Sequence, residues 1–380
     1  MKANPFVYPF VPFINLADKN IRANFISRKE IDLPELKKLI GILPVSSPQI
    51  NGETIAERIL SVFQDENYRF GPKEYIQENK DSWITKLDYF INQGLPIQLT
   101  ILGFPFKVPV PLKTNRVLPD MGEVLSLLRL NNIVDNIQKI YIQGAVITIF
   151  TEGVFGRFSG VPEEEWVAYR KFLEKLNELL RLSPALKIID LSEMEKIVPD
   201  FQARCQQRAQ QFKELYHRSD PEFLAKYEGT YEAVLRIIST KDYNESLLMD
   251  VYNEKLGDKD VSDEVKKIRH DIQTKTHDSI FQYHAYLKMR DGIDHLEKVV
   301  PHGLPLTVSP KVNRLGIFLV SKVCSRLPYH GVPVYYPKKN LFLIEYLIDI
   351  KRHQTNFTPV YFSQDQDDKP FYYIALDDEL

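Results

Sequence analysis

The chain has 380 residues, of which 44% are hydrophobic and 26% charged, and 49 basic residues against 51 acidic ones leave a net charge of −2. This composition is typical of a folded globular protein and excludes a chain that is disordered throughout. The balanced charge argues against binding of nucleic acid through the overall field of the protein, but it is compatible with a local basic pocket.

The cysteines and the apolar segments bear on the cellular compartment. Cys205 and Cys324 are far apart in the sequence, so they form neither a disulfide framework nor a CxxC pair that could hold zinc. The apolar stretch at residues 6–16 is interrupted by Pro9 and Pro12 and makes a poor signal peptide. No apolar run reaches the roughly 20 residues that a membrane helix needs. We therefore expect a cytoplasmic protein.

The glycine spacing excludes the common cofactor-binding motifs. The 16 glycines form neither the GxGxxG turn of dinucleotide-binding folds nor the phosphate loop that precedes a lysine. The GxSxG elbow of hydrolases and the HExxH zinc motif are also absent. Any chemistry must therefore come from residues that do not form a widely shared short motif.

The first half of the chain alternates between helical and extended patterns. Spacing of about 3.6 residues predicts helices over 33–42, 53–64 and 73–92, which would form an N-terminal layer. Short apolar runs then predict buried strands at 96–104, 140–150 and 186–191. Helices are expected between them, at 124–137 and 162–182. This order is typical of a mostly parallel sheet with covering helices.

We therefore predict an α/β fold with a Rossmann-like, mostly parallel core, an N-terminal helical layer and a β-rich C-terminal part. The predicted segments are an N-terminal arm and helical layer at 1–93, an α/β core at 94–191, a helical segment at 192–296, and a β-rich part at 297–380 that completes the core. Short β runs in the last segment are expected at 306–309, 315–320, 332–336, 341–348 and 371–375.

Two stretches of the chain contain no acidic residue. Between Asp88 and Asp120 the basic residues Lys107, Lys113 and Arg116 all follow the first predicted strand. A second window, at 298–344, contains seven basic residues, Lys311 and Arg314 among them. Loops that follow parallel strands meet at one edge of a sheet, where such folds bind ligands, so the two stretches could form an anion pocket. Alternatively, such windows arise by chance, because strands contain few acidic residues anyway.

Asp120 and Glu123 have two possible roles. Asp120 stands where a helix N-cap is expected and Glu123 three residues later, which is the pattern of a capping box. Beside a basic loop, the same two carboxylates could instead transfer protons. Arg129 lies on a different face of this helix from Glu123 and is expected to support the helix. Arg157, in the turn after the second strand, is a further candidate for the pocket.

The histidines offer one candidate acid or base. His270, His277 and His284 recur every seven residues of a predicted helix, a spacing of about 10.5 Å that is too long for two of them to bind one metal ion. We interpret them as a polar stripe, although one of them could reach a pocket. His330 lies in a constrained loop between two β runs, where it is either a catalytic acid or base or a structural residue.

Several short runs then resemble a known family. They are similar to the pyoverdine/dityrosine biosynthesis family, the PvcA-like isocyanide (isonitrile) synthases, in order and spacing over about 95–180 and more loosely over 280–335. The runs are 104–107 (FPFK), 119–123 (PDMGE), 144–149 (GAVITI), 152–155 (EGVF), 160–161 (GV), 309–311 (SPK) followed by Arg314, and 329–332 (YHGV).

The resemblance implies an enzyme that converts the α-amine of an amino acid, tyrosine or tryptophan, to an isocyanide. The extra carbon would come from ribulose 5-phosphate as co-substrate, without a metal or an organic cofactor, and the product could pass to an iron/2-oxoglutarate oxygenase. With this reaction, the proton-transferring groups would be Asp120, Glu123 and His330. The phosphate and carboxylate would be bound by Lys107, Lys113 and Arg116, with Arg157, Lys311 and Arg314 as further candidates.

Two positions differ from the family pattern. Ser309 stands where a histidine commonly precedes the proline, and Tyr329 stands where a tryptophan commonly precedes His-Gly. Because of these differences, the sequence does not identify the side chain of the amino-acid substrate. Two other functions are compatible with the same basic loops: a non-catalytic protein that binds a sugar phosphate or an amino acid, and an unrelated phosphosugar isomerase or aldolase.

Overall fold

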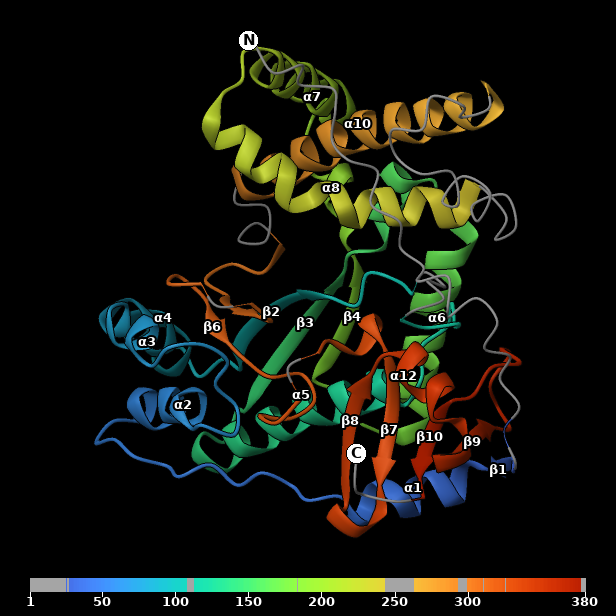
Figure 1. Cartoon of the computed structure of the whole chain (residues 1–380). Coiled ribbons are helices and arrows are strands. Elements are labelled where there is room, and N and C mark those ends of the chain that lie inside the picture. Colours follow the sequence, from blue (N-terminus) through green and yellow to red (C-terminus); the bar gives the residue numbers. More distant parts are fainter. Residues whose placement is uncertain are drawn as a thin grey trace.

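The core of the molecule is a five-stranded parallel sheet in the order β4-β3-β2-β5-β6 (Figure 1). The computed structural model describes residues 25, 27–107, 113–182, 184–242, 263–292, 299–309, 311–324 and 326–376. The predicted N-terminal apolar segment at 6–16 lies outside these residues. The core strands are β2 (Ile97–Gly103), β3 (Ala145–Thr151), β4 (Leu186–Asp190), β5 (Leu304–Thr307) and β6 (Leu315–Gly316). The predicted α/β class and parallel core are confirmed.

The central strands are apolar because the sheet is covered on both faces. Six of the seven residues of β2 are buried, and the same holds for β3, as expected of a parallel sheet packed between helices. The helices α5 (Met121–Ile140) and α6 (Glu163–Leu180) connect the core strands. Three glutamates begin α6, where the positive end of its dipole lies, and Arg181 ends it in the left-handed conformation.

In the described part of the chain, four helices precede the core sheet. They are α1 (Leu33–Ile42), α2 (Ile55–Gln64), α3 (Glu74–Gln77) and α4 (Lys80–Asn92). Capping boxes start α1 and α2, formed by Asp32 with Glu35 and by Thr54 with Glu57. The helix expected at 73–92 is interrupted before Lys80 and forms α3 and α4. Helix α2 packs on α4 and α5, and α4 packs on β2, so these helices cover the core.

The C-terminal region adds a second sheet, in the order β1-β9-β10-β7-β8. Of the strands described in this region, β5 and β6 alone extend the core sheet. The strands of the second sheet are β1 (Lys29–Ile31), β7 (Val332–Tyr336), β8 (Leu341–Glu345), β9 (Phe357–Phe362) and β10 (Tyr372–Ala375), and the short helix α12 (Leu347–Arg352) lies between β8 and β9. Strand β1 pairs in parallel with β9, so the two ends of the described chain meet in this sheet.

Three helices of the described residues form a separate lobe with its own hydrophobic core (Figure 1). They are α7 (Phe201–His217), α8 (Pro221–Asp242) and α10 (Asp263–Gly292). Two members of the predicted histidine stripe contact α8: His277 hydrogen-bonds Tyr227, and His284 lies 3.0 Å from the Thr230 hydroxyl.

Among the described residues, no helix is both long and apolar enough to cross a membrane.

Arg116 joins the loop before α5 to the loop between β9 and β10. Its guanidinium is fully buried and donates to Asp365 Oδ2 at 2.6 Å, to the Lys369 carbonyl at 2.7 Å and to the Pro119 carbonyl at 3.0 Å. Longer bonds reach the carbonyls of Leu118 and Pro370. All these acceptors belong to the protein, so in this structure Arg116 fixes the second sheet against the start of α5.

This position generates a stability prediction. The Arg116→Met substitution should lower the free energy of unfolding by about 3–5 kcal/mol, because Asp365 would remain buried without its counter-ion. Urea unfolding followed by circular dichroism measures the change. The matched control is Arg28→Met, which removes an exposed arginine paired with Glu30 and should cost less than about 1 kcal/mol. An Arg116 variant as stable as this control would contradict the structural role.

Candidate functional site

The loops that follow β2 and β3 meet at the carboxyl edge of the core sheet. The chain leaves β2 through Phe104, whose backbone is left-handed (φ 51°), and continues to Lys107. After β3 it forms the 3-10 helix η2 (Gly153–Ser159). The two loops touch closely: a Cβ on Gly153 would lie 3.2 Å from the Pro105 carbonyl oxygen and 2.9 Å from the ring of Trp166. Glycine is therefore needed at this contact.

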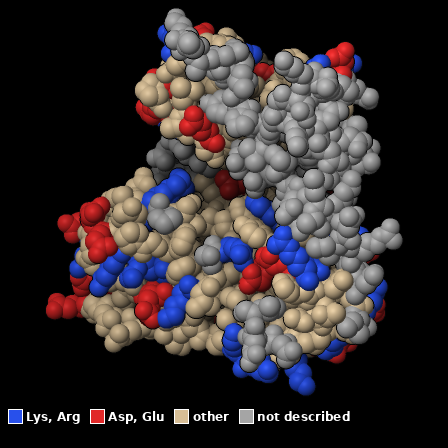
Figure 2. Space-filling model, viewed as in Figure 1, with Lys and Arg blue, Asp and Glu red and all other residues tan. Residues whose placement is uncertain are grey.

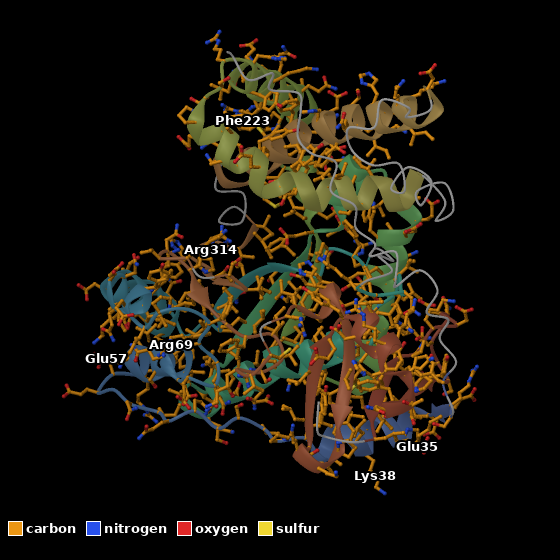
Figure 3. All side chains as sticks on the ribbon, viewed as in Figure 1. Glu35, Lys38, Glu57, Arg69, Phe223 and Arg314 are labelled. Carbon is orange, nitrogen blue, oxygen red and sulfur yellow. The ribbon has the colours of Figure 1, made fainter. Side chains whose placement is uncertain are left out.

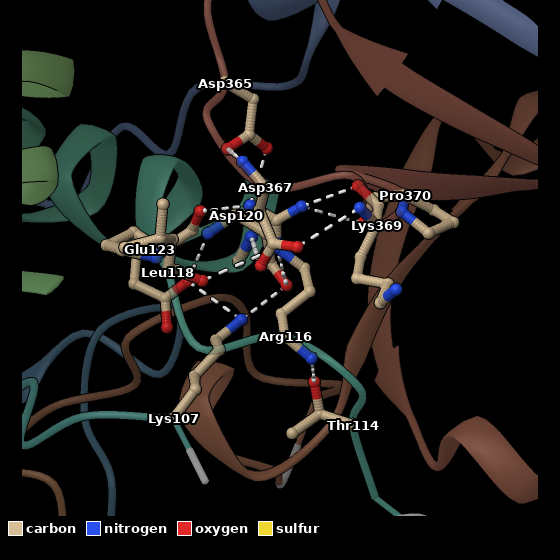
Figure 4. Close-up of polar contacts among 12 residues, drawn as sticks. Lys107, Thr114, Arg116, Leu118, Asp120, Glu123, Asp365, Asp367, Lys369 and Pro370 are labelled. Atoms are coloured by element: carbon tan, nitrogen blue, oxygen red, sulfur yellow. Dashed lines mark hydrogen bonds and ion pairs between the residues drawn. The ribbon is translucent and has the colours of Figure 1, made fainter. Parts of the chain in front are cut away.

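Lys107 is the centre of a fully buried group of ionisable side chains (Figure 4). Its ammonium forms ion pairs with Asp120 Oδ2 and with Glu123 Oε2, the latter at 3.0 Å. The Tyr169 hydroxyl donates to Glu123 Oε1 at 3.0 Å. We refer to Lys107, Asp120, Glu123 and Tyr169 as the Lys107 cluster. The sequence placed Lys107 and the two carboxylates in one candidate site, and the structure brings them into contact.

The same carboxylates begin α5. Asp120 Oδ1 accepts a hydrogen bond from the Gly122 amide at 2.8 Å, and Glu123 Oε2 accepts one from the Asp120 amide at 2.8 Å. This is the predicted capping box. Each carboxylate therefore binds the helix backbone and Lys107 at once, so capping and participation in the cluster are not alternatives.

The charges in this region do not balance. Asp120, Glu123 and Asp365 supply three carboxyl groups, whereas Lys107 and Arg116 supply two cations. Burial raises the pKa of Asp120 to about 7, and Glu123 adds to this effect, while Lys107 and Arg116 oppose it. Burial also raises the pKa of Asp365. A carboxyl group with a pKa near the ambient pH can both donate and accept a proton, as acid–base catalysis requires.

A second loop packs on the first turn of α5 and carries His330. This loop forms the 3-10 helix η4 (Pro328–His330). A Cβ on Gly122 would lie 3.0 Å from Pro328 Cβ, which shows how closely the loop approaches α5. Tyr329 is buried, and its pKa is raised chiefly by burial and also by the charges of Glu152 and Glu123. The loop thus connects the Lys107 cluster with the end of β3.

His330 is accessible to solvent, although protein surrounds it closely. The surrounding protein limits the hydration of the charged imidazole and so lowers the pKa of His330 to about 4, and the positive charge of Lys113 adds to the effect. The imidazole ring lies edge to face with that of Tyr329, with centroids 4.8 Å apart. At neutral pH His330 is therefore a neutral imidazole that solutes can reach, next to one of the predicted anion-binding lysines.

The other predicted binding residues lie elsewhere. Arg157 pairs with Glu195 at 3.2 Å and lines a pocket of about 300 Å³ between η2, α7 and α10. The loop that carries Lys311 and Arg314 contacts the start of α4, because Asn79 Nδ2 donates to the Val312 carbonyl at 2.7 Å. Figure 3 shows Arg314 on the side of the molecule that carries α3 and α4. These three residues do not join the Lys107 cluster.

Glu152 and Tyr169 were not predicted as site residues. Glu152 follows β3 directly, so the rule that ligands bind at the carboxyl ends of parallel strands could have identified it. Tyr169 lies inside α6 and carries no such signal.

Around the carboxyl edge of the core sheet, the surface is hollowed between the helical lobe and the α/β body. Both acidic and basic side chains border the hollow (Figure 2).

Comparison with known proteins adds independent information. The family model for pyoverdine/dityrosine biosynthesis protein matches residues 87–349. The chain is 24% identical over 268 residues to L-tryptophan isonitrile synthase AmbI2 of Fischerella ambigua, across 68% of this chain and 74% of that protein. It is 35% identical over 130 residues to the L-tyrosine isonitrile synthase of Xenorhabdus nematophila, across 33% of this chain and 39% of that protein.

A solved structure is similar in fold. The crystal structure of the PvcA protein from Pseudomonas aeruginosa superposes with a TM-score of 0.61 at 21% sequence identity. The match covers 85% of this chain and 100% of that chain, so it includes most of the architecture described above.

Proposed function

The chain belongs to the pyoverdine/dityrosine biosynthesis protein family, as its sequence motifs predicted, and from this membership we propose that it is an isocyanide synthase. The observation that carries the proposal is the match over residues 87–349, because this range contains the whole Lys107 cluster and the His330 loop. The family and the acid–base groups thus indicate the same region of the molecule.

We propose that the substrate is an aromatic amino acid and that ribulose 5-phosphate supplies the isocyanide carbon. The names of the two relatives, a tryptophan and a tyrosine isonitrile synthase, support an amino-acid substrate of this kind. The α-amine would condense with the C2 carbonyl of the sugar and release water. Proton transfers and cleavage of the C1–C2 and C2–C3 bonds would then leave C2 on the nitrogen and release the two remaining fragments of the sugar. The proposal includes no metal and no organic cofactor.

The proton transfers require groups with different pKa values. Asp120, with a pKa of about 7, can hold a proton at neutral pH, whereas His330, with a pKa of about 4, is a neutral base. We assign these two groups and Glu123 to proton transfer. Lys113, whose charge acts on His330, is assigned to the phosphate or carboxylate of a substrate. Lys107 is assigned to holding the two carboxylates in place.

The direct test is an assay of the purified protein with a mixture of common amino acids, with and without ribulose 5-phosphate. We expect an isocyanide that forms only when the sugar phosphate is present, detected by mass spectrometry and tetrazine trapping. Consumption of the sugar phosphate without an amino acid would instead indicate an isomerase or aldolase. Binding of both compounds without turnover, by folded protein, would indicate a non-catalytic binding protein.

The His330→Ala variant tests the assigned base. It should lower kcat by about 100-fold, the usual contribution of a general acid or base. The matched control is His353→Ala, which removes an exposed histidine after α12 and should leave kcat within about twofold of the wild type. A loss below about tenfold for His330→Ala, in protein with an unchanged circular dichroism spectrum, would assign this residue a structural role.

A further inference from the structure

A second pocket lies where α5, the α1–α2 connection and β8 meet, and it has a volume of about 230 Å³. Most of its wall is apolar, with Leu43, Leu125, Leu128 and Phe342 among the lining residues. Arg129 lines the same pocket and lies six residues after Glu123, about 9 Å farther along α5. The proposed function gives this pocket no role.

Arg129 is a buried cation that forms no ion pair with a carboxylate in the described part of the chain, although the charge of Asp65 acts on it. Only 9% of the residue is exposed to solvent. Nη1 donates to the Ser46 hydroxyl at 2.6 Å, and the guanidinium lies 4.2 Å from the centroid of the Tyr68 ring. Nε has no hydrogen-bond partner. Buried charges in proteins are normally paired, so this guanidinium has unused capacity for an anion.

A second side chain with unused hydrogen-bonding capacity lines the same pocket. Ser321 Oγ is buried and makes no hydrogen bond in the structure. Buried hydroxyl groups usually have a partner, because an unsatisfied one costs about 1–3 kcal/mol. A ligand with a carboxylate could accept hydrogen bonds from both Arg129 and Ser321. The apolar wall would then contact the remainder of that ligand.

We propose that this pocket binds a small apolar monocarboxylate, with its carboxylate at Arg129 and Ser321 and its hydrocarbon part against the leucines. The volume is below the roughly 300–1,000 Å³ of pockets for drug-sized ligands, so one ring or a short chain is the appropriate size. A planar guanidinium suits a carboxylate because it can donate two parallel hydrogen bonds.

Asp135 narrows the ligand class further. It lines the same pocket, and its carboxylate accepts a hydrogen bond from Asn131 at 2.8 Å. Its negative charge disfavours a ligand with a second acidic group, so dicarboxylates and phosphate esters should bind more weakly than monocarboxylates. The site therefore differs in specificity from one that takes a sugar phosphate.

Isothermal titration calorimetry of the full chain with 3-phenylpropionate tests the proposal without requiring turnover. We expect saturable binding that is at least tenfold weaker for 3-phenylpropanamide, which lacks the charge, and for phenylsuccinate, which carries two charges. Arg129→Met should weaken binding of the monocarboxylate at least tenfold. Leu128→Phe, which keeps the arginine and fills the pocket, should do the same. The exposed control Arg352→Met should bind like the wild type.

Three results would overturn the proposal. The first is the absence of saturable binding up to about 10 mM in folded protein. The second is equal affinity for the acid and its amide, which would indicate a purely apolar site. The third is binding that survives both pocket variants, which would place the ligand elsewhere, for example near the Lys107 cluster. None of these results bears on isocyanide synthesis, so the two proposals can fail independently.

Discussion

The structure depends on the burial of three carboxyl groups and two cations at the first turn of α5. Lys107 comes from the loop after β2, Arg116 from the loop before α5, and Asp365 from the loop between β9 and β10. Their contacts join the parallel core to the second sheet at one point. Because buried charges are tolerated only when they are paired and hydrogen-bonded, each of these loops is held by the others.

This arrangement also gives the site its chemical character. A surface cluster of the same composition would be fully ionised and screened by water. Here burial and the excess of one carboxyl group favour retention of a proton by Asp120 up to about pH 7. The capping bonds fix both carboxylates, so the group that can exchange a proton is also positioned rigidly. The structural role and the proposed role in proton transfer therefore fall on the same side chains.

Much of the core could be predicted from the sequence because its signals are local. The segments of β2 and β3 are short and mostly apolar, and Asp120 with Glu123 forms a capping pattern that a single turn of helix determines. The pairing of β1 with β9 could not be predicted, because the two strands are more than 300 residues apart in the sequence and short strands carry little information about their partners.

Contacts between residues far apart in the sequence also limited the prediction of the site, as the surroundings of Arg116 show. Its position in a basic loop predicted a group that binds the phosphate or carboxylate of a substrate, whereas its pairing with Asp365 depends on a loop at the other end of the chain. The excess of one carboxyl group could not be predicted either, because Asp365, the third carboxyl group, lies 249 residues from Arg116 in the sequence. Only the folded structure brings Asp365 to these cations.

The central claim is that Asp120 retains a proton to near-neutral pH inside the Lys107 cluster. The most direct measurement is an NMR titration of the side-chain carboxyl carbons in protein labelled with ¹³C at aspartate, for the wild type and for Asp120→Asn. We predict one aspartate resonance with a midpoint near pH 7 that is missing from the variant. Titration of every aspartate below about pH 5 in folded wild-type protein would contradict the claim.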